Sequence, residues 1–120
     1  MTIPNPLVIT VNGSAKNLDR INQDGYSSHY RLRESAQQFD VRIRHSNGKT
    51  MKNGKVSERH NVELTRTVFA AGAVPEYSYV SSVTITNDDL VSSTDMGYLQ
   101  TSLNGLLTAG IVSDLRAWVN

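Results

Sequence analysis

The sequence predicts an α+β fold with an N-terminal β-hairpin, an antiparallel meander sheet and two C-terminal α-helices. Three observations lead to this prediction. Asn12-Gly13 follows a β-branched run and is typical of a tight hairpin turn. In residues 26–33, 39–45, 56–69 and 77–86, apolar and polar side chains alternate with the period of two that strands require. After residue 92 the apolar spacing changes to the period of 3.6 that helices require.

The length and composition indicate one globular domain. A chain of 120 residues buries one ordinary core, so we expect residues 1–120 to form a single domain. Within it, residues 1–25 form the hairpin, 26–87 the sheet and 92–120 the two helices. The apolar runs fall short of the roughly 20 residues that cross a bilayer, so no membrane partner is expected. The N-terminus lacks a basic segment followed by an apolar one, which favours use in a cytoplasm.

The hairpin and the first strands are read from turn signals and alternation. The hairpin runs from Leu7 to Val11 and returns over residues 15–22, whose polar side chains favour a place at an edge or on the surface. Residues 26–33 and 39–45 are the next two strands, each with one apolar and one basic face. Residues 46–55 contain two Asn-Gly pairs and predict a basic turn or ribbon tip.

The longest predicted strand runs from Val56 to Phe69. Its alternation directs Val62 and Leu64 toward a core and leaves a polar face on the other side. A loop of small residues follows, and residues 77–86 supply the last strand. Tyrosines that share the parity of the apolar residues are expected in the core: Tyr26, Tyr30 and Tyr79.

Two helices are predicted at the C-terminus. Asn87-Asp88-Asp89 or Ser92-Ser93 supplies the N-cap, and Thr108-Ala109-Gly110 is expected to end the first helix. An apolar stripe at helical spacing is predicted to form core or dimer contacts: Met96, Leu99, Leu103, Leu106, Leu107, Leu115 and Trp118. Two helices are too few to cover the apolar side of the sheet, so we expect a homodimer that exchanges helices.

The polar side of the predicted sheet carries the candidate functional residues. Arginines and hydrogen-bonding side chains share this face: His29, Arg31, Arg33, Arg42, Arg44, Arg59, Asn61, Thr65, Ser82 and Thr84. Guanidinium groups bind phosphates, and amide and hydroxyl groups bind sugars and base edges, so this face is predicted to bind RNA. The alternative is a solvated sheet face whose arginines pair with Asp40 and Glu63.

No catalytic or metal-binding pattern appears in the sequence. There is no cysteine, and His29, His45 and His60 have no recognised ligand spacing. Carboxylates are scattered, and no glycine-rich loop opens a helix. We therefore predict no enzyme, no metal site and no cofactor, and expect the histidines to be structural or on the surface.

Five segments in this order resemble one protein family: Ile21-Asn22-Gln23-Asp24-Gly25-Tyr26, Val41-Arg42-Ile43-Arg44-His45, Glu58-Arg59-His60-Asn61-Val62-Glu63, Thr67-Val68-Phe69-Ala70 and Pro75-Glu76. They resemble coat proteins of the single-stranded RNA bacteriophages, the leviviruses, and most closely the branch typified by a phage of Caulobacter. The likeness extends over nearly the whole chain. Its specificity lies in the ordered set of segments, since none is a chemical signature alone.

The resemblance implies an interlocked homodimer with one continuous sheet. Such dimers build a small icosahedral capsid, commonly of T=3 symmetry, with the sheet facing inward onto single-stranded genomic RNA. It further implies a virion assembled in the bacterial host cytoplasm, a maturation protein as a partner and, in many members, repression of replicase translation. Whether structural calcium lies between subunits is left open.

Two details of the family map onto particular residues. The loop before the last long strand gathers at the symmetry axes in the family and corresponds here to Ala71, Gly72, Ala73, Val74, Pro75 and Glu76. Better-studied members stack an RNA base on a tyrosine of the last strand, whereas the parity of Tyr79 turns this side chain toward the core. The rival hypotheses are a cellular dimeric RNA-binding regulator that forms no shells and an enzyme with a sheet-lined pocket.

Overall fold

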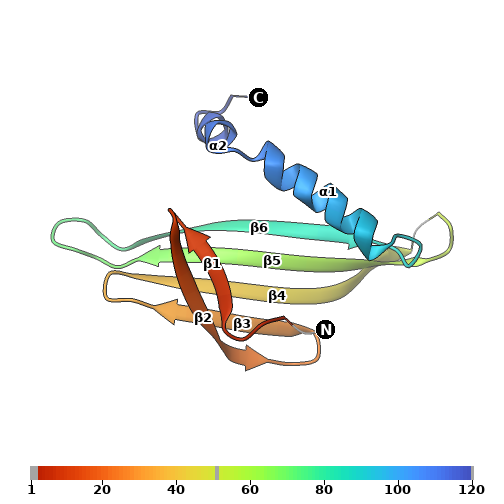
Figure 1. Ribbon diagram of the computed structural model, residues 1–120, viewed down its shortest axis with the longest axis horizontal. Coiled ribbons are helices and arrows are strands. Elements are labelled where there is room, and N and C mark those ends of the chain that lie inside the picture. The colour runs from red at the N-terminus through yellow and green to blue at the C-terminus, as the bar shows by residue number, and fades with distance from the viewer. Residues whose placement is uncertain (1–2, 51, 120) are drawn as a thin grey trace. The chain divides into compact units, whose positions relative to one another are not determined.

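The computed structural model describes residues 3–50 and 52–119 and confirms the predicted α+β architecture (Figure 1). The described elements follow the chain in this order: β1 (Leu7–Val11), β2 (Ser14–Gln23), β3 (Ser27–Arg33), β4 (Gln37–Thr50), β5 (Val56–Val68), β6 (Tyr77–Asn87), α1 (Ser93–Leu106) and α2 (Ala109–Arg116). The chain divides into two compact units between Thr86 and Asn87. The first unit holds the strands and the second holds the helices. That the whole chain forms a single domain stays a prediction.

The sheet is a meander whose strand order is the order of the chain, β1-β2-β3-β4-β5-β6. Each pair from β1 to β5 is antiparallel, and Val11 faces Ser14 across the first turn. Asn12 and Gly13 have φ angles of 50° and 79° in that turn. Two successive positive φ angles fit the right-handed twist of a two-residue hairpin, which is why Asn-Gly marks this position.

The strand β2 belongs to both the hairpin and the sheet. Its first half pairs with β1 and its second half with β3, and the register shifts between Arg20 and Asn22. The bend directs the hairpin across one side of the sheet rather than along its edge (Figure 1). We call this side the core face. The hairpin lies at one end of the strand order, as the sequence indicated, but Leu18 of β2 is fully buried.

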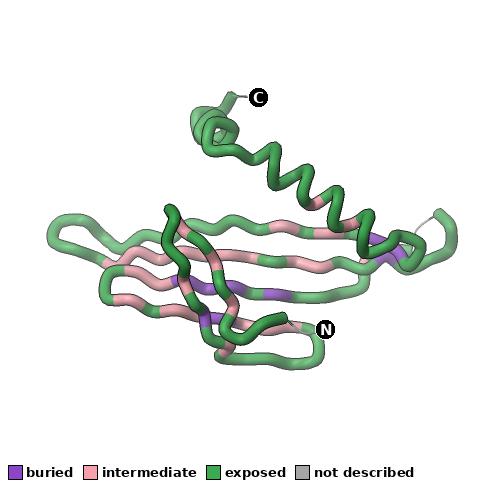
Figure 2. The backbone as a smooth tube through the Cα atoms, viewed as in Figure 1, coloured by how far each residue is buried: buried purple, intermediate pink, exposed green. Residues whose placement is uncertain are grey.

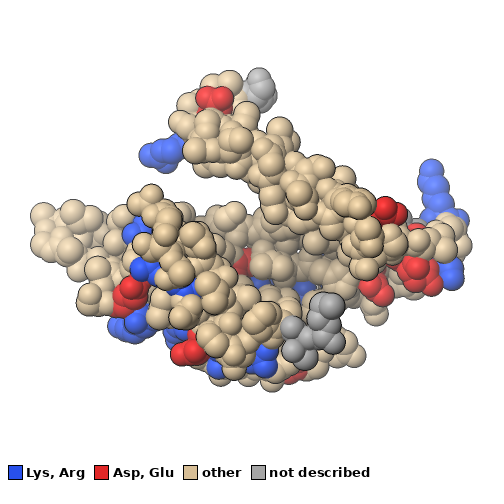
Figure 3. Space-filling view, viewed as in Figure 1, with Lys and Arg blue, Asp and Glu red and all other residues tan. Residues whose placement is uncertain are grey.

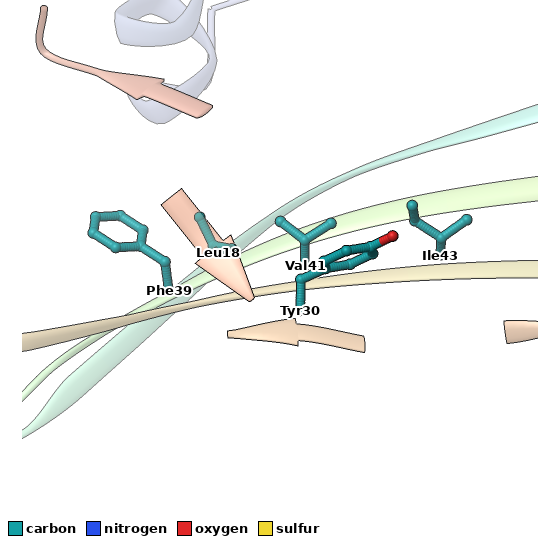
Figure 4. Packing of buried hydrophobic residues seen from close by; sticks show 5 residues of the cluster. All are labelled: Leu18, Tyr30, Phe39, Val41 and Ile43. Carbon is teal, nitrogen blue, oxygen red and sulfur yellow. The ribbon is translucent and has the colours of Figure 1, made fainter. Parts of the chain in front are cut away.

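A small hydrophobic core lies between the hairpin and the core face (Figures 2 and 4). Its buried members are Leu18, Tyr30, Phe39, Val41 and Ile43. The hairpin covers only part of this face, since Val62 and Tyr79 remain 44% and 55% exposed. Tyr26, expected in the core, is 76% exposed because it precedes β3 at a turn. Of the tyrosines assigned to the core, only Tyr30 is buried there.

The strands β4 and β5 form the longest ribbon of the sheet, from the pair Gln37 and Val68 to the pair Thr50 and Val56. The predicted turn over residues 46–55 is shorter than expected, because β4 continues through Asn47 and Gly48 to Thr50. A Cβ atom at Gly48 would lie 2.3 Å from Ser57 Oγ. Gly48 therefore permits close approach of two strands rather than a change of chain direction.

The helices begin at hydroxyl N-caps. Ser92 Oγ accepts a hydrogen bond from the backbone N–H of Asp95 at 3.1 Å. Ser92 belongs to one of the two segments that were predicted to supply the N-cap. Thr108 was predicted to help end α1, but it caps α2, where its Oγ1 accepts from Ile111 N–H at 3.4 Å. Ala109 and Gly110 are thus the first residues of α2 rather than a stop signal.

Most residues of the two helices are exposed (Figure 2), including the apolar ones. No described residue of α1 or α2 is buried, and Leu99 is 75% exposed. Trp118, predicted in the second helix, lies beyond its end with a φ angle of 64° and is 93% exposed. Neither helix is long and apolar enough to span a membrane. Charged side chains are sparse on this unit in the view of Figure 3.

Candidate nucleic-acid interface

The predicted RNA-binding residues share the side of the sheet opposite the core face, which we call the polar face. The register places His29 beside Arg42, and Arg44 beside Asn61. Asn61 Nδ2 donates to Thr84 Oγ1 at 3.1 Å, which puts β6 side chains of the same parity on this face. By the same alternation, the face also includes Arg31, Arg33, Arg59, Thr65 and Ser82.

A buried carboxylate organises one part of the polar face. Asp40 Oδ1 accepts from Arg31 Nε at 2.8 Å and lies 2.7 Å from His29 Nε2. Its Oδ2 accepts from Gln38 Nε2 at 2.8 Å. Burial raises the pKa of the Asp40 carboxyl, but the hydrogen bonds from Gln38, Arg31 and His29 outweigh it and hold the pKa below its ordinary value. His29 and Arg31 are therefore engaged in stabilising the sheet.

A second network joins the strands β4, β5 and β6. Arg44 Nη2 forms an ion pair with Glu63 and donates to Asn61 Oδ1 at 3.0 Å. Asn61 Nδ2 in turn donates to Val83 O at 3.2 Å as well as to Thr84. Both amide hydrogens of Asn61 are thus used within the sheet. This side chain fixes β6 beside β5 and has little donor capacity left for a ligand.

Other arginines of the polar face lack a carboxylate partner. Among the described residues, no Asp or Glu forms an ion pair with Arg33, Arg42 or Arg59. The guanidinium group of Arg33 lies 4.9 Å from the ring centroid of Phe69. Arg42 and Arg59 are exposed, and their charges face solvent. The alternative hypothesis, a solvated face whose arginines pair with carboxylates, therefore holds for Arg31 and Arg44. It does not hold for Arg42 and Arg59.

Two adjoining hollows collect most of the predicted residues. The larger, about 870 Å³, is lined by Asp24, Gly25, Tyr26, Ser27, Arg44, His45, Ser46, Arg59, Asn61, Glu63, Ser82 and Thr84. The smaller, about 140 Å³, is lined by Asn22, Ser27, Ser28, His29, Arg42 and Arg44. Arg44 borders both. Arg31, Arg33 and Thr65 belong to the same face but line neither hollow.

The sequence-based prediction missed the turn at the rim of the larger hollow. Asp24 Oδ1 accepts from the backbone N–H groups of Tyr26 and Ser27, both at 2.8 Å, and Asp24 Oδ2 accepts from Ser27 Oγ at 2.9 Å. These bonds, first that from Tyr26 N–H, lower the pKa of Asp24. The sequence analysis did not assign this turn to the site, because only the pairing of β3 with β4 brings it beside Arg44.

The chemistry of the polar face suits a polyanion with sugar and base groups. Its arginines outnumber its carboxylates, which are Asp19, Asp40 and Glu63. Exposed guanidinium groups bind phosphate oxygens through paired hydrogen bonds. Ser82 and Thr84 add hydroxyl groups beside them. The face is wide and shallow and is not a closed pocket. Such open surfaces are typical of sites that bind linear polymers.

Comparisons with solved structures first identify the class of protein to which the fold belongs. The fold is similar to that of the virus-like particle of Beihai levi-like virus 21, with a TM-score of 0.71 and 13% identity over 97% of this chain and 95% of that chain. It is also similar to the coat protein of bacteriophage EMS014, with a TM-score of 0.64 and 20% identity over 89% and 78% of the two chains. At these identities the likeness concerns the fold, which is that of levivirus-like coat proteins.

The particular family follows from the sequence. The family described as the coat protein of phage phiCb5 matches residues 4–88, more than two thirds of the chain, and the chain belongs to this family. No curated protein sequence matches it. The protein is thus a phage coat protein, a structural and non-enzymatic component of the virion that associates with copies of itself. The family resemblance read from the sequence is confirmed.

Proposed function

We propose that this coat protein dimerises, assembles into a small icosahedral shell and packages single-stranded RNA on its polar face. The observation that supports RNA packaging is the pair of exposed arginines, Arg42 and Arg59, that have no carboxylate partner in the described chain. Each lines one of the two adjoining hollows. A polyanion that enters these hollows meets uncompensated positive charge, and its binding releases counterions.

Two uncovered apolar surfaces support dimerisation. One is the part of the core face that the hairpin leaves exposed, including Val62 and Tyr79. The other is the apolar stripe of the helices, including Leu99, Leu103 and Leu106. Exposed apolar areas of this kind mark interaction sites. A homodimer in which the helices of each copy cover the core face of the other removes both surfaces from water, with the sheet continuous across the two copies.

The loop between β5 and β6 is proposed to form contacts at the symmetry axes of a T=3 shell. Its backbone closes on itself, since the N–H and C=O groups of Ala71 and Val74 exchange two hydrogen bonds of 3.0 Å. Gly72 has a φ angle of 57° there, and the remaining loop side chains are exposed. A short exposed loop with small side chains suits contacts that differ among quasi-equivalent positions.

General genome packaging is a better-supported proposal than repression of replicase translation. Repression requires recognition of one RNA hairpin, for which better-studied relatives stack a base on a tyrosine of the last strand. Here Tyr79 accepts a hydrogen bond from Arg66 Nη1 at 2.9 Å on the core face, away from the proposed RNA. Assembly in the host cytoplasm with a maturation protein completes the proposal and rests on family membership alone.

The experiment is negative-stain electron microscopy of the recombinant protein, with absorbance at 260 and 280 nm on the same size-exclusion fraction. Uniform shells that carry host RNA are the expected result. A small dimer that forms no particles, even with added RNA, would instead favour the RNA-binding regulator. Empty shells would support the proposed assembly and contradict the proposed RNA packaging.

A further inference from the structure

A histidine pair lies on the core face, and one of its members, His45, also borders the larger hollow of the polar face. His45 of β4 and His60 of β5 are directly opposite each other, and their Nδ1 atoms are 2.8 Å apart. The backbone N–H of His45 donates to Tyr26 O on the side of β3, so His45 and His60 form a non-hydrogen-bonded pair. Such pairs hold opposite side chains closest together, which explains the short distance.

A carboxylate orients one of the two rings. Glu58 Oε2 lies 3.3 Å from His60 Nε2. When His60 donates Nε2–H to this carboxylate, its Nδ1 keeps a lone pair that is directed at His45. Histidines that bind metal ions commonly donate the other ring N–H to a carboxylate in this way, which fixes the tautomer and makes the ligating nitrogen more basic.

The surroundings leave room for an ion and its water ligands. The pair opens into a hollow of about 250 Å³ that is lined by Tyr26, His45, Ser46, Asn47, Glu58 and His60. Among the described residues, the lining of this hollow includes no lysine or arginine and one carboxylate, that of Glu58. No group of three or more His, Asp or Glu in the described chain is arranged to hold a metal ion. The protein therefore offers two nitrogen ligands, and water completes the coordination.

We propose that His45 and His60 chelate one transition-metal ion, such as Cu²⁺, Ni²⁺ or Zn²⁺, through their Nδ1 atoms. Nitrogens about 2.1 Å from a shared ion lie about 3 Å apart at the roughly 90° angle of tetragonal Cu²⁺ or Ni²⁺ and about 3.4 Å apart at the tetrahedral angle of Zn²⁺. The 2.8 Å found here is closest to the tetragonal value. The proton between the rings moves to Nε2 of His45, so both ligands are neutral imidazoles. Imidazole selects these metals, whereas Ca²⁺ and Mg²⁺ select oxygen ligands.

The test uses the full chain without a polyhistidine tag, titrated with Cu²⁺ and followed by electron paramagnetic resonance, and with Zn²⁺ by calorimetry. We expect one ion per chain and hyperfine structure from two nitrogens. His60→Gln should weaken binding at least tenfold and remove the two-nitrogen pattern. Glu58→Gln should weaken binding about tenfold and keep the stoichiometry, because it removes only the orienting carboxylate.

His29→Gln is the matched control, because it also leaves two of the three histidines but retains the pair. Its metal affinity should equal that of the wild type. Equal affinity of the wild type and His60→Gln, or no binding by the wild type, would overturn the proposal. Circular dichroism of each variant tests whether the sheet is retained, which is expected of His60→Gln and Glu58→Gln because Glu58 is exposed and His60 is partly exposed. In His29→Gln the glutamine amide can still donate to Asp40, the partner of His29 in the sheet.

Discussion

Arg42 and Glu63 lie directly opposite each other on β4 and β5, yet the Glu63 carboxylate pairs with Arg44. Cross-strand neighbours of opposite charge ordinarily compensate each other. Here the carboxylate is engaged by the next arginine along the same face, and Arg42 stays exposed without a carboxylate partner in the described chain. The distribution of partners, rather than the number of arginines, decides which charges are available to a ligand.

Arg42→Ala should weaken RNA binding without unfolding the protein. Each phosphate contact with a single strand contributes about 0.7 to the slope of log affinity against log salt concentration, so the slope should fall by about that amount. RNA affinity at several salt concentrations measures it. Arg116→Ala removes the same charge from α2 and is the matched control. Equal slopes for Arg42→Ala and the wild type would place RNA elsewhere.

Asp40→Asn should lower the free energy of unfolding by about 1–3 kcal/mol, because hydrogen bonds to a buried charge are lost. Denaturant unfolding of the unassembled protein measures the change. The matched control is Asp19→Asn, which alters an exposed carboxylate and should shift stability by less than about 0.5 kcal/mol. Similar losses in both variants would contradict a stabilising role for the Asp40 network.

The same carboxylate predicts acid sensitivity. Its pKa is lowered in the folded state from an ordinary value of 3.8. The contribution to stability is therefore complete above the unfolded-state pKa and is lost as the pH falls through the lower folded-state pKa. Unfolding free energies measured over this acid range should fall more steeply for the wild type than for Asp40→Asn. Parallel curves would show that Asp40 contributes nothing to acid sensitivity.

Gly48→Ala should destabilise the ribbon of β4 and β5 by about 1–3 kcal/mol, because the new Cβ atom meets Ser57 Oγ at 2.3 Å. Thermal unfolding measures the loss. Gly25→Ala is the control, since no atom lies within 4 Å of its added Cβ. The double variant Gly48→Ala/Ser57→Ala removes the clashing oxygen and should recover stability. If the double variant were less stable than Gly48→Ala, the clash would not be the cause.

Leu103→Asp should prevent dimerisation and particle assembly, because it places a charge in the apolar stripe of α1 that is proposed to cover a partner. Analytical ultracentrifugation measures the oligomeric state. Thr101→Asp adds the same charge on the opposite side of the helix and should assemble normally. Assembly by both variants would exclude this stripe from the dimer interface.

Local patterns predicted much of the fold. Alternation located the long strand over Val56–Val68, and Ser92, in one of the two predicted N-cap segments, precedes the start of α1 at Ser93. Both features depend on residues that are close in the sequence, so they could be predicted from it. Thr108 was misassigned because a capping threonine and a short loop before the next helix resemble a helix stop when only the residue types are known. Gly48 was misassigned because its constraint comes from Ser57 on another strand.

The sequence predicted which residues share the polar face, but it did not predict which partners their side chains have. Period-two alternation placed the arginines on one face, as the register shows. It did not show that Asp40 engages Arg31 while Arg42 has no carboxylate partner among the described residues, because that choice depends on side-chain geometry across strands. The same reason hid the contact between His45 and His60, which are 15 residues apart in the sequence. Ion-pair partners and contacts between histidines on different strands are set by the tertiary structure, which local sequence patterns do not show.

The bend in β2 also determines how far the sheet grows. A flat sheet with two open edges adds further copies at both ends and builds fibres. Because β2 bends at the register shift between Arg20 and Asn22, β1 is directed over the core face, and the edge at that end of the strand order is out of line with the long strands. The edge that remains in line with the long strands is β6, at the opposite end of the strand order. Two copies that join through β6 use this edge in both copies, so further growth by strand pairing would need the displaced edge of β1.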